Sequence, residues 1–251
     1  MRALRLLAVF LVCGPGHPAP RGRFSRSVWS VPSPLPRGAM VVVGFLGGWE
    51  KRDDERRSVR KLALRLREAG LPRLYVETAG NHDRKQVRRI LLESLDSDRD
   101  GRLSREEAES VAFVFYGQSF GGAAAVYLAR DLERHGVPVR LTVQVDSVGR
   151  RDHWIPANVA RALNLYQRDP GPIRGEPAIR AADSSRTQIL GNLPFTYLFR
   201  EVDMSGYPAI ARRIGLSHWK MDNDPAVWAI VEAAIRAEIT RWQAETAGAE
   251  R

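Results

Sequence analysis

The chain has 251 residues, of which 44% are hydrophobic and 27% are charged, and its formal net charge is +10. These values exclude a mainly disordered chain, a collagen and a coiled coil, and no apolar run reaches the length of about 18 residues that a membrane-spanning helix needs. A single cysteine excludes an internal disulfide and a cysteine-rich zinc site.

The N-terminal part of the chain, residues 1–38, differs in composition from the rest. Arg2 and Arg5 precede a short apolar run over 6–13, which is typical of a secretory signal peptide. Gly, Pro, Ser and Arg dominate residues 14–38, which predicts a flexible lead-in. We therefore expect an exported protein, periplasmic or secreted. The alternative is a cytoplasmic protein whose true start is Met40, just before the first predicted strand.

From residue 39 onward, apolar runs alternate with amphipathic segments. The apolar runs predict strands over 39–43, 74–77, 113–116 and 139–145, with shorter candidates at 187–190 and 196–199. A spacing of three and four residues predicts helices over 54–69, 83–95 and 121–135. A last helix is predicted to begin at Pro225, with a buried stripe of Trp228, Val231, Ile235, Ile239 and Trp242. This alternation predicts an α/β fold over 39–246, with a mainly parallel sheet flanked by helices.

A glycine-rich turn follows the third predicted strand. Gly117, Ser119 and Gly121 form the pattern G-x-S-x-G, between an apolar strand and an alanine-rich helix. Small flanking residues permit the sharp turn that exposes a nucleophilic serine, and the N-terminus of the following helix favours a developing negative charge. The pattern predicts that Ser119 is a nucleophile.

The partners of this serine are expected later in the chain, an acid first and then a histidine. Asp146 ends the strand after the nucleophile helix, and Asp203 is the alternative acid. His218 lies in a predicted loop before the last helix, where the general base is expected, whereas His153 is the histidine nearest to Asp146 in sequence. The predicted catalytic set is Ser119, Asp146 and His218.

The glycine-rich segment 44–48 follows the first predicted strand and is expected to face the serine. A backbone N–H of Phe45 or Leu46, together with that of Phe120, would form an oxyanion hole. A dinucleotide site is not expected, because the pattern G-x-G-x-x-G is absent.

Residues 96–107 have the spacing of an EF-hand loop: Asp-x-Asp-x-Asp-Gly, then five residues and Glu. In such a loop alternate acidic side chains point inward, glycine allows the sharp turn, position seven offers its carbonyl and the last Glu is bidentate. The predicted calcium ligands are Asp96, Asp98, Asp100, Arg102, Ser104 and Glu107. The EF-hand would span 84–110, with a short exit helix and no second loop to pair with it.

Together these motifs resemble a bacterial subgroup of the α/β-hydrolase superfamily, similar to lipases and thioesterases, that carries a single EF-hand. The resemblance covers about residues 39–242, and many relatives carry His at the position of Gln118. It rests on the segments 41–48, 96–107, 116–122, 145–148, 155–159, 164–167 and 217–219. It implies an α/β-hydrolase fold, with Ser119 as nucleophile, Asp146 as acid and His218 as base.

Two functions follow from these observations. The first is a serine hydrolase that acts on a small-molecule or lipid-like acyl ester or thioester and holds a structural calcium ion. The second is a non-catalytic calcium-binding protein that uses the hydrolase fold as a scaffold. A dockerin-like module is discounted, because the duplicated loop that it requires is absent. No nucleic-acid partner is expected, because no basic stripe is interleaved with stacking aromatic residues.

Overall fold

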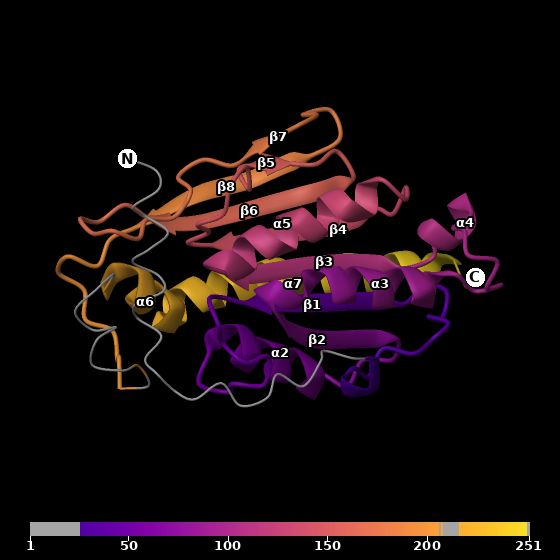
Figure 1. The fold of residues 1–251 in the computed structure, drawn as a ribbon, viewed down its shortest axis with the longest axis horizontal. Coiled ribbons are helices and arrows are strands. Elements are labelled where there is room, and N and C mark those ends of the chain that lie inside the picture. Colours follow the sequence, from indigo (N-terminus) through magenta and orange to yellow (C-terminus); the bar gives the residue numbers. More distant parts are fainter. Residues whose placement is uncertain (1–25, 206, 208–215, 250–251) are drawn as a thin grey trace.

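A computed structural model describes residues 26–205, 207 and 216–249. Its central sheet has six parallel strands in the order β2-β1-β3-β4-β6-β8, and a small parallel pair joins β5 to β7 (Figure 1). The bounds of the strands are β1 Met40–Leu46, β2 Leu74–Gly80, β3 Ala112–Gln118, β4 Val139–Val145, β5 Trp154–Ile155, β6 Val159–Gln167, β7 Arg180–Ala181 and β8 Gln188–Phe195. The chain therefore has the α/β fold, with a parallel sheet flanked by helices, that the alternating pattern predicts.

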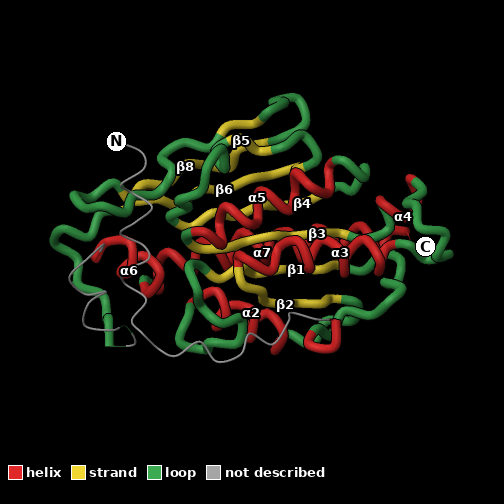
Figure 2. The backbone as a smooth tube through the Cα atoms, viewed as in Figure 1, coloured by secondary structure: helices red, strands yellow, loops and turns green. Residues whose placement is uncertain are grey.

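Helices run alongside the strands and cover both faces of the sheet (Figure 2). The helical segments are η1 Arg26–Val28, α2 Ser58–Glu68, η2 Asn81–Asp83, α3 Arg84–Leu95, α4 Arg105–Ala108, α5 Phe120–Glu133, α6 Leu216–Asn223 and α7 Pro225–Ala249. One core packs the inward faces of α3 and α5 against the sheet, and the other packs α2 and α7 against the opposite face. All five residues of the predicted stripe on the last helix are buried.

The strand order reverses at one point of the sheet, between β1 and β3. The chain runs from β1 outward to β2, then crosses back to β3 on the other side of β1. The crevice where the strand order reverses, at the carboxyl ends of β1 and β3, is where open α/β sheets bind ligands. The segment that follows β1 and the serine that follows β3 both lie there.

Some elements differ from their predictions. β1 extends through Leu46, so Phe45 and Leu46 end the strand and do not begin the loop. β6 was not predicted, because Arg161, Asn164 and Gln167 interrupt its apolar pattern. Each of these three side chains has a partner inside the fold, namely Glu238, Asn192 and Asp146. The candidate strand over 196–199 is wrong, because β8 ends at Phe195.

Residues 26–38 pack against the domain. Trp29, Val31 and Leu35 are buried in the core beside α3, and the backbone N–H of Ser30 donates to Glu77 Oε1 at 2.7 Å. The flexible lead-in is therefore wrong for this part of the chain, because its apolar side chains fill space beside the sheet. The signal-like segment lies outside the described residues. No helix in the described part of the chain is long and apolar enough to cross a membrane.

Candidate active site

Ser119 lies at a sharp turn between β3 and α5, as the G-x-S-x-G pattern predicts. Its backbone has φ 58° and ψ −126°, a conformation that residues with side chains adopt only where the surroundings enforce it. A Cβ at Gly121 would collide with the carbonyl group of Phe45, and one at Gly117 would collide with the backbone of Gly121. The two glycines of the motif are therefore required by the close approach of three backbone segments.

Asp146 and His218 meet at the carboxyl edge of the sheet. Asp146 directly follows β4, and its Oδ2 lies 2.6 Å from Nδ1 of His218. Both side chains are buried. An ionised carboxylate only accepts hydrogen bonds, so the contact places the imidazole proton on Nδ1 and leaves a lone pair on Nε2. His218 lies in α6, so the predicted loop is wrong at this point; the helix holds the imidazole over the end of the sheet.

The carboxylate of Asp146 is also held by a residue to which the sequence assigned no role. The backbone N–H of Gln167 donates to Oδ1 at 3.0 Å, and its side-chain Nε2 donates to Oδ2 at 2.8 Å. These bonds fix the orientation of the acid. The alternative acid, Asp203, is exposed and accepts a hydrogen bond from the N–H of Ser205. His153, the alternative histidine, lies near Glu176.

Gln118 lies against the free nitrogen of the imidazole. Its Nε2 is 3.1 Å from His218 Nε2, so the amide donates to the lone pair. Among the residues that the structure describes, Ser119 Oγ makes no hydrogen bond with the imidazole, although Ser119 is the next residue along the chain. Serine–histidine hydrogen bonds in active sites often tighten only when a substrate is bound. Gln118 thus occupies the position that the serine hydroxyl would take.

The predicted oxyanion donors lie around the same turn. Phe120 is the first residue of α5, where backbone N–H groups have no partner within the helix. Phe45 pairs with Gly117 of β3, whereas Leu46 extends one residue beyond that last pair. Gly47 lies beside the serine, because a Cβ there would lie 2.9 Å from Ser119 Cβ. The sequence did not single out Gly47 itself, although it lies in the predicted glycine-rich segment.

A buried ion cluster joins the segment after β1 to α6. Arg57 Nε lies 3.0 Å from Glu50 Oε1, and its guanidinium lies 4.1 Å above the ring of Tyr207 and 4.0 Å from Asp222 on α6. Burial, with a smaller contribution from Asp222, raises the pKa of Glu50 from 4.5 to about 8. Burial also raises the pKa of Asp222 above its ordinary value. The cluster connects the Gly47 segment with the helix that carries His218, since the N–H of Glu50 donates to the carbonyl of Gly47 at 3.1 Å.

The predicted calcium loop lies between α3 and α4, at the opposite edge of the sheet. Ligand atoms of Asp96, Asp98 and Glu107 lie within 4.8 Å of one another, and Gly101 has a φ of 81°. Asp100 instead accepts a hydrogen bond from the N–H of Arg102 at 2.7 Å. The structure thus brings three of the four predicted carboxylate ligands together.

The oxygens of these carboxylates suit a hard cation. Asp96 Oδ1 is buried and has no hydrogen-bond partner among the described residues. Glu107 accepts hydrogen bonds from the side chains and backbone of Ser97 and Ser104, which lower its pKa to about 2. Part of this bonding is a capping box at the start of α4, because Ser104 Oγ also accepts from the N–H of Glu107. Ionised carboxylates in a loop of this spacing fit calcium, which prefers oxygen ligands.

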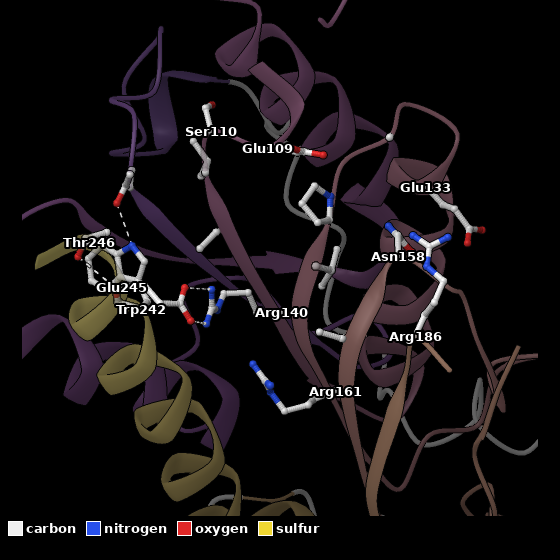
Figure 3. A pocket seen from close by; sticks show the side chains of 18 of the residues that line it. Glu109, Ser110, Glu133, Arg140, Asn158, Arg161, Arg186, Trp242, Glu245 and Thr246 are labelled. Carbon is white, nitrogen blue, oxygen red and sulfur yellow. Dashed lines mark hydrogen bonds and ion pairs between the residues drawn. The ribbon is translucent and has the colours of Figure 1, made fainter. Parts of the chain in front are cut away.

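A cavity of about 790 Å³ also lies at the amino ends of β3, β4 and β6, and Figure 3 shows side chains that line it. Two of the three arginines that line it, Arg140 and Arg161, pair with neighbouring acids. Arg140 forms a double hydrogen bond with Glu245 at 2.7 Å, and Arg161 pairs with Glu238. Because it lies at the ends of the strands opposite the serine, the cavity is not part of the candidate active site.

No protein-family model matches this chain, and no curated protein is similar to it in sequence. Among solved structures it is similar to a thioesterase, RedJ, from the prodiginine biosynthetic pathway in Streptomyces coelicolor, with 12% identity, a TM-score of 0.41 and coverage of 84% of this chain and 99% of that chain. It is also similar to a dienelactone hydrolase from Anabaena variabilis, with 15% identity, a TM-score of 0.40 and coverage of 80% of this chain and 86% of that chain. A cutinase-like protein from Cryptococcus sp. is similar as well, with 12% identity, a TM-score of 0.38 and coverage of 79% of this chain and 94% of that chain. These TM-scores lie below 0.5, and the α/β fold of the chain rests on its own strand order.

Proposed function

We propose that this protein is a serine hydrolase that acts on an ester or thioester through Ser119, His218 and Asp146. The observation that carries the proposal is the convergence of these residues where the strand order reverses. Asp146 contacts His218 at 2.6 Å, and the serine lies on a strained turn beside it. A buried acid–histidine pair of this geometry is the arrangement that activates a serine hydroxyl.

The proposed reaction uses each of these groups in turn. The substrate displaces Gln118 from His218 Nε2, and Nε2 then accepts the proton of Ser119 Oγ as this oxygen attacks the acyl carbon. The oxyanion that forms is stabilised by the N–H of Phe120 and by a donor from residues 45–47. The imidazolium returns the proton to the departing alcohol or thiol, and Asp146 offsets its charge. Water, activated by the same imidazole, then releases the carboxylic acid and regenerates the serine.

Exposed apolar side chains in the segments that follow the strands support an apolar acyl substrate. Trp49 follows β1, and Leu198 and Phe199 follow β8; their exposed fractions are 47%, 57% and 97%. The segment after β8 also contacts α6, because Lys220 Nζ donates to the carbonyl of Arg200 at 2.7 Å. Large apolar groups that remain in contact with water commonly mark binding surfaces.

We further propose that the loop over 96–107 binds calcium and that the ion acts on stability alone. β3 separates this loop from Ser119, and seven residues of strand correspond to about 20 Å. Figure 1 places α4, at the end of the loop, and α6, which carries His218, at opposite ends of the strands. An ion at that distance does not polarise a carbonyl group at the serine.

One observation favours the alternative of a calcium-binding scaffold without catalysis. His218 Nε2 is occupied by Gln118, and Ser119 is only 4% exposed. In that case the buried pair of Asp146 and His218 would serve only to hold α6 on the sheet.

Turnover of a panel of nitrophenyl esters and acyl thioesters distinguishes the two functions. We expect hydrolysis by the parent protein and its loss in Ser119→Ala, while Ser185→Ala, which changes an exposed serine, keeps the parent rate. Absence of hydrolysis across the panel, or equal rates for the parent and Ser119→Ala, would contradict the proposal.

A further inference from the structure

Three potential metal ligands converge beside the segment that follows β4. Asp152 and His153 lie between β4 and β5, and Glu176 lies between β6 and β7. One ligand atom from each lies within 4.8 Å of the others. His153 Nδ1 is 3.8 Å from Glu176 Oε2, which is beyond hydrogen-bond distance. The three groups therefore approach one another without bonding directly.

The carboxylate of Asp152 is fixed at one oxygen and free at the other. The side chain is fully buried, and its Oδ2 accepts hydrogen bonds from the hydroxyl of Ser147 and from the N–H of Gly149 at 3.1 Å. Its Oδ1 is buried and has no hydrogen-bond partner among the described residues. A buried acceptor without a donor is costly, and a cation removes that cost.

We propose that Asp152, His153 and Glu176 bind a divalent transition metal ion of the zinc class. Zinc binds imidazole nitrogen and carboxylate oxygen at about 2.0–2.2 Å, so its tetrahedral ligands lie roughly 3.4 Å apart. The ligand atoms lie within 4.8 Å of one another, and His153 Nδ1 is 3.8 Å from Glu176 Oε2, so small side-chain movements bring them to this spacing. The side chains of His153 and Glu176 are 33% and 30% exposed, so they can close around an ion that arrives from solvent.

The ligand atoms of this site suit a different metal from those of the proposed calcium loop. The loop over 96–107 offers oxygen alone, which suits calcium, whereas an imidazole with two carboxylates suits zinc, cobalt or nickel. Three protein ligands leave a fourth position for water or a small ligand. The hydrogen bonds of Asp152 to Ser147 and Gly149 hold the ligand carboxylate in place, as partners of ligating groups do in other metal sites.

The ion would join two segments that border Asp146. Ser147 follows Asp146 directly, and its carbonyl accepts a hydrogen bond from the N–H of Glu176 at 2.8 Å. A metal at Asp152, His153 and Glu176 therefore ties the segment after β4 to the segment after β6. The site does not include Ser119 or His218, so it does not depend on the proposed hydrolase activity.

Cobalt(II) is the probe, because its visible absorption reports the coordination of nitrogen and oxygen ligands. The full chain, without an affinity tag and with excess calcium present, is titrated with cobalt(II). Zinc is then added to displace it. We expect one equivalent to bind with saturation, and His153→Ala and Glu176→Gln each to weaken binding at least about tenfold. His135→Ala, which removes an exposed histidine at the end of α5, is the matched control and should bind as the parent does.

Asp152→Asn is the most specific variant, because an asparagine oxygen can still accept from Ser147 and Gly149 while its amide replaces the free oxygen. Its folding is checked by circular dichroism; if it unfolds, the partly exposed His153 and Glu176 variants still test the site. A titration without saturable absorption would overturn the proposal. So would cobalt binding that is equally tight in the parent and in His153→Ala, because the ion would then lie elsewhere.

Discussion

The contact between Asp146 and His218 joins two residues that lie 72 positions apart in the sequence. Asp146 is buried, accepts two hydrogen bonds from Gln167 and faces the imidazole. Asp203 is exposed and accepts a hydrogen bond from the N–H of Ser205, two residues along the chain. The order of residues in the chain did not decide which of the two is the acid that pairs with the histidine. The geometry favours Asp146 as the group that orients His218.

Substitution of the two acids tests this choice. Asp146→Asn would present an amide to Nδ1 and favour the wrong tautomer of the imidazole, so we expect kcat to fall by roughly 10⁴-fold. Asp203→Asn should change kcat less than twofold. Steady-state kinetics on an ester that the parent hydrolyses is the measurement. A large loss in Asp203→Asn, with a small one in Asp146→Asn, would show that the acid is misassigned.

At the scale of elements, the ion cluster of Glu50, Arg57 and Asp222 ties the segment after β1 to α6. The pKa of Glu50 is raised in the folded state, so the folded protein holds a proton that the unfolded chain releases above about pH 4.5. Stability is therefore lost as the pH rises from about 4.5 through about 8. We expect Glu50→Gln, which mimics the protonated form, to flatten the decline in the free energy of unfolding across this range.

Urea unfolding at several pH values measures this effect. Glu55→Gln, a change at an exposed position of the same segment, is the control and should follow the parent curve. If the Glu50→Gln curve has the slope of the parent, Glu50 does not titrate with folding, and the proposed proton linkage fails.

The proposed calcium loop over 96–107 is a second element whose contribution to stability can be measured separately. Glu107→Gln removes the carboxylate that lies near Asp96 and Asp98, so calcium affinity and melting temperature should fall together. At a hundred times its dissociation constant, an ion that binds only the folded state stabilises it by about 2.7 kcal/mol. Glu106→Gln, at the neighbouring exposed position, should leave both quantities unchanged. Calorimetry with and without calcium makes the comparison.

Turnover by Glu107→Gln shows whether calcium affects stability alone or also catalysis. At a temperature where Glu107→Gln remains folded, we expect its kcat to match that of the parent. Loss of kcat at an unchanged folded fraction would place calcium in the mechanism.

The sequence predicted the elements whose formation depends on residues close together in the chain. The apolar runs predicted β1 and β4, and the glycine spacing predicted the turn at Ser119. In contrast, β6 carries polar residues whose partners lie on other elements, and α6 has too little apolar periodicity to be recognised as a helix. The contacts of Gln118 with His218, and of Glu50 with Arg57, depend on the packing of segments far apart in the sequence. No spacing in the chain indicates them.

At the scale of the molecule, β3 links the two sites in the proposed function. Its amino end follows the loop over 96–107 and the short helix α4, and its carboxyl end leads into Ser119 (Figure 1). β3 lies between β1 and β4 in the middle of the sheet, so we expect calcium binding at its amino end to stabilise the whole fold. The strand order places the serine beside the Gly47 segment, and α6 brings His218 to the same edge.

The central claim is that Ser119 is an activated nucleophile, and labelling with a fluorophosphonate tests it most directly. The folded parent protein is treated with the probe, and the adduct is located by mass spectrometry of the digested protein. The account predicts one adduct, on Ser119, that is absent in Ser119→Ala and strongly slowed in His218→Ala. A folded parent protein that stays unlabelled, or that carries the adduct on another serine, would contradict it.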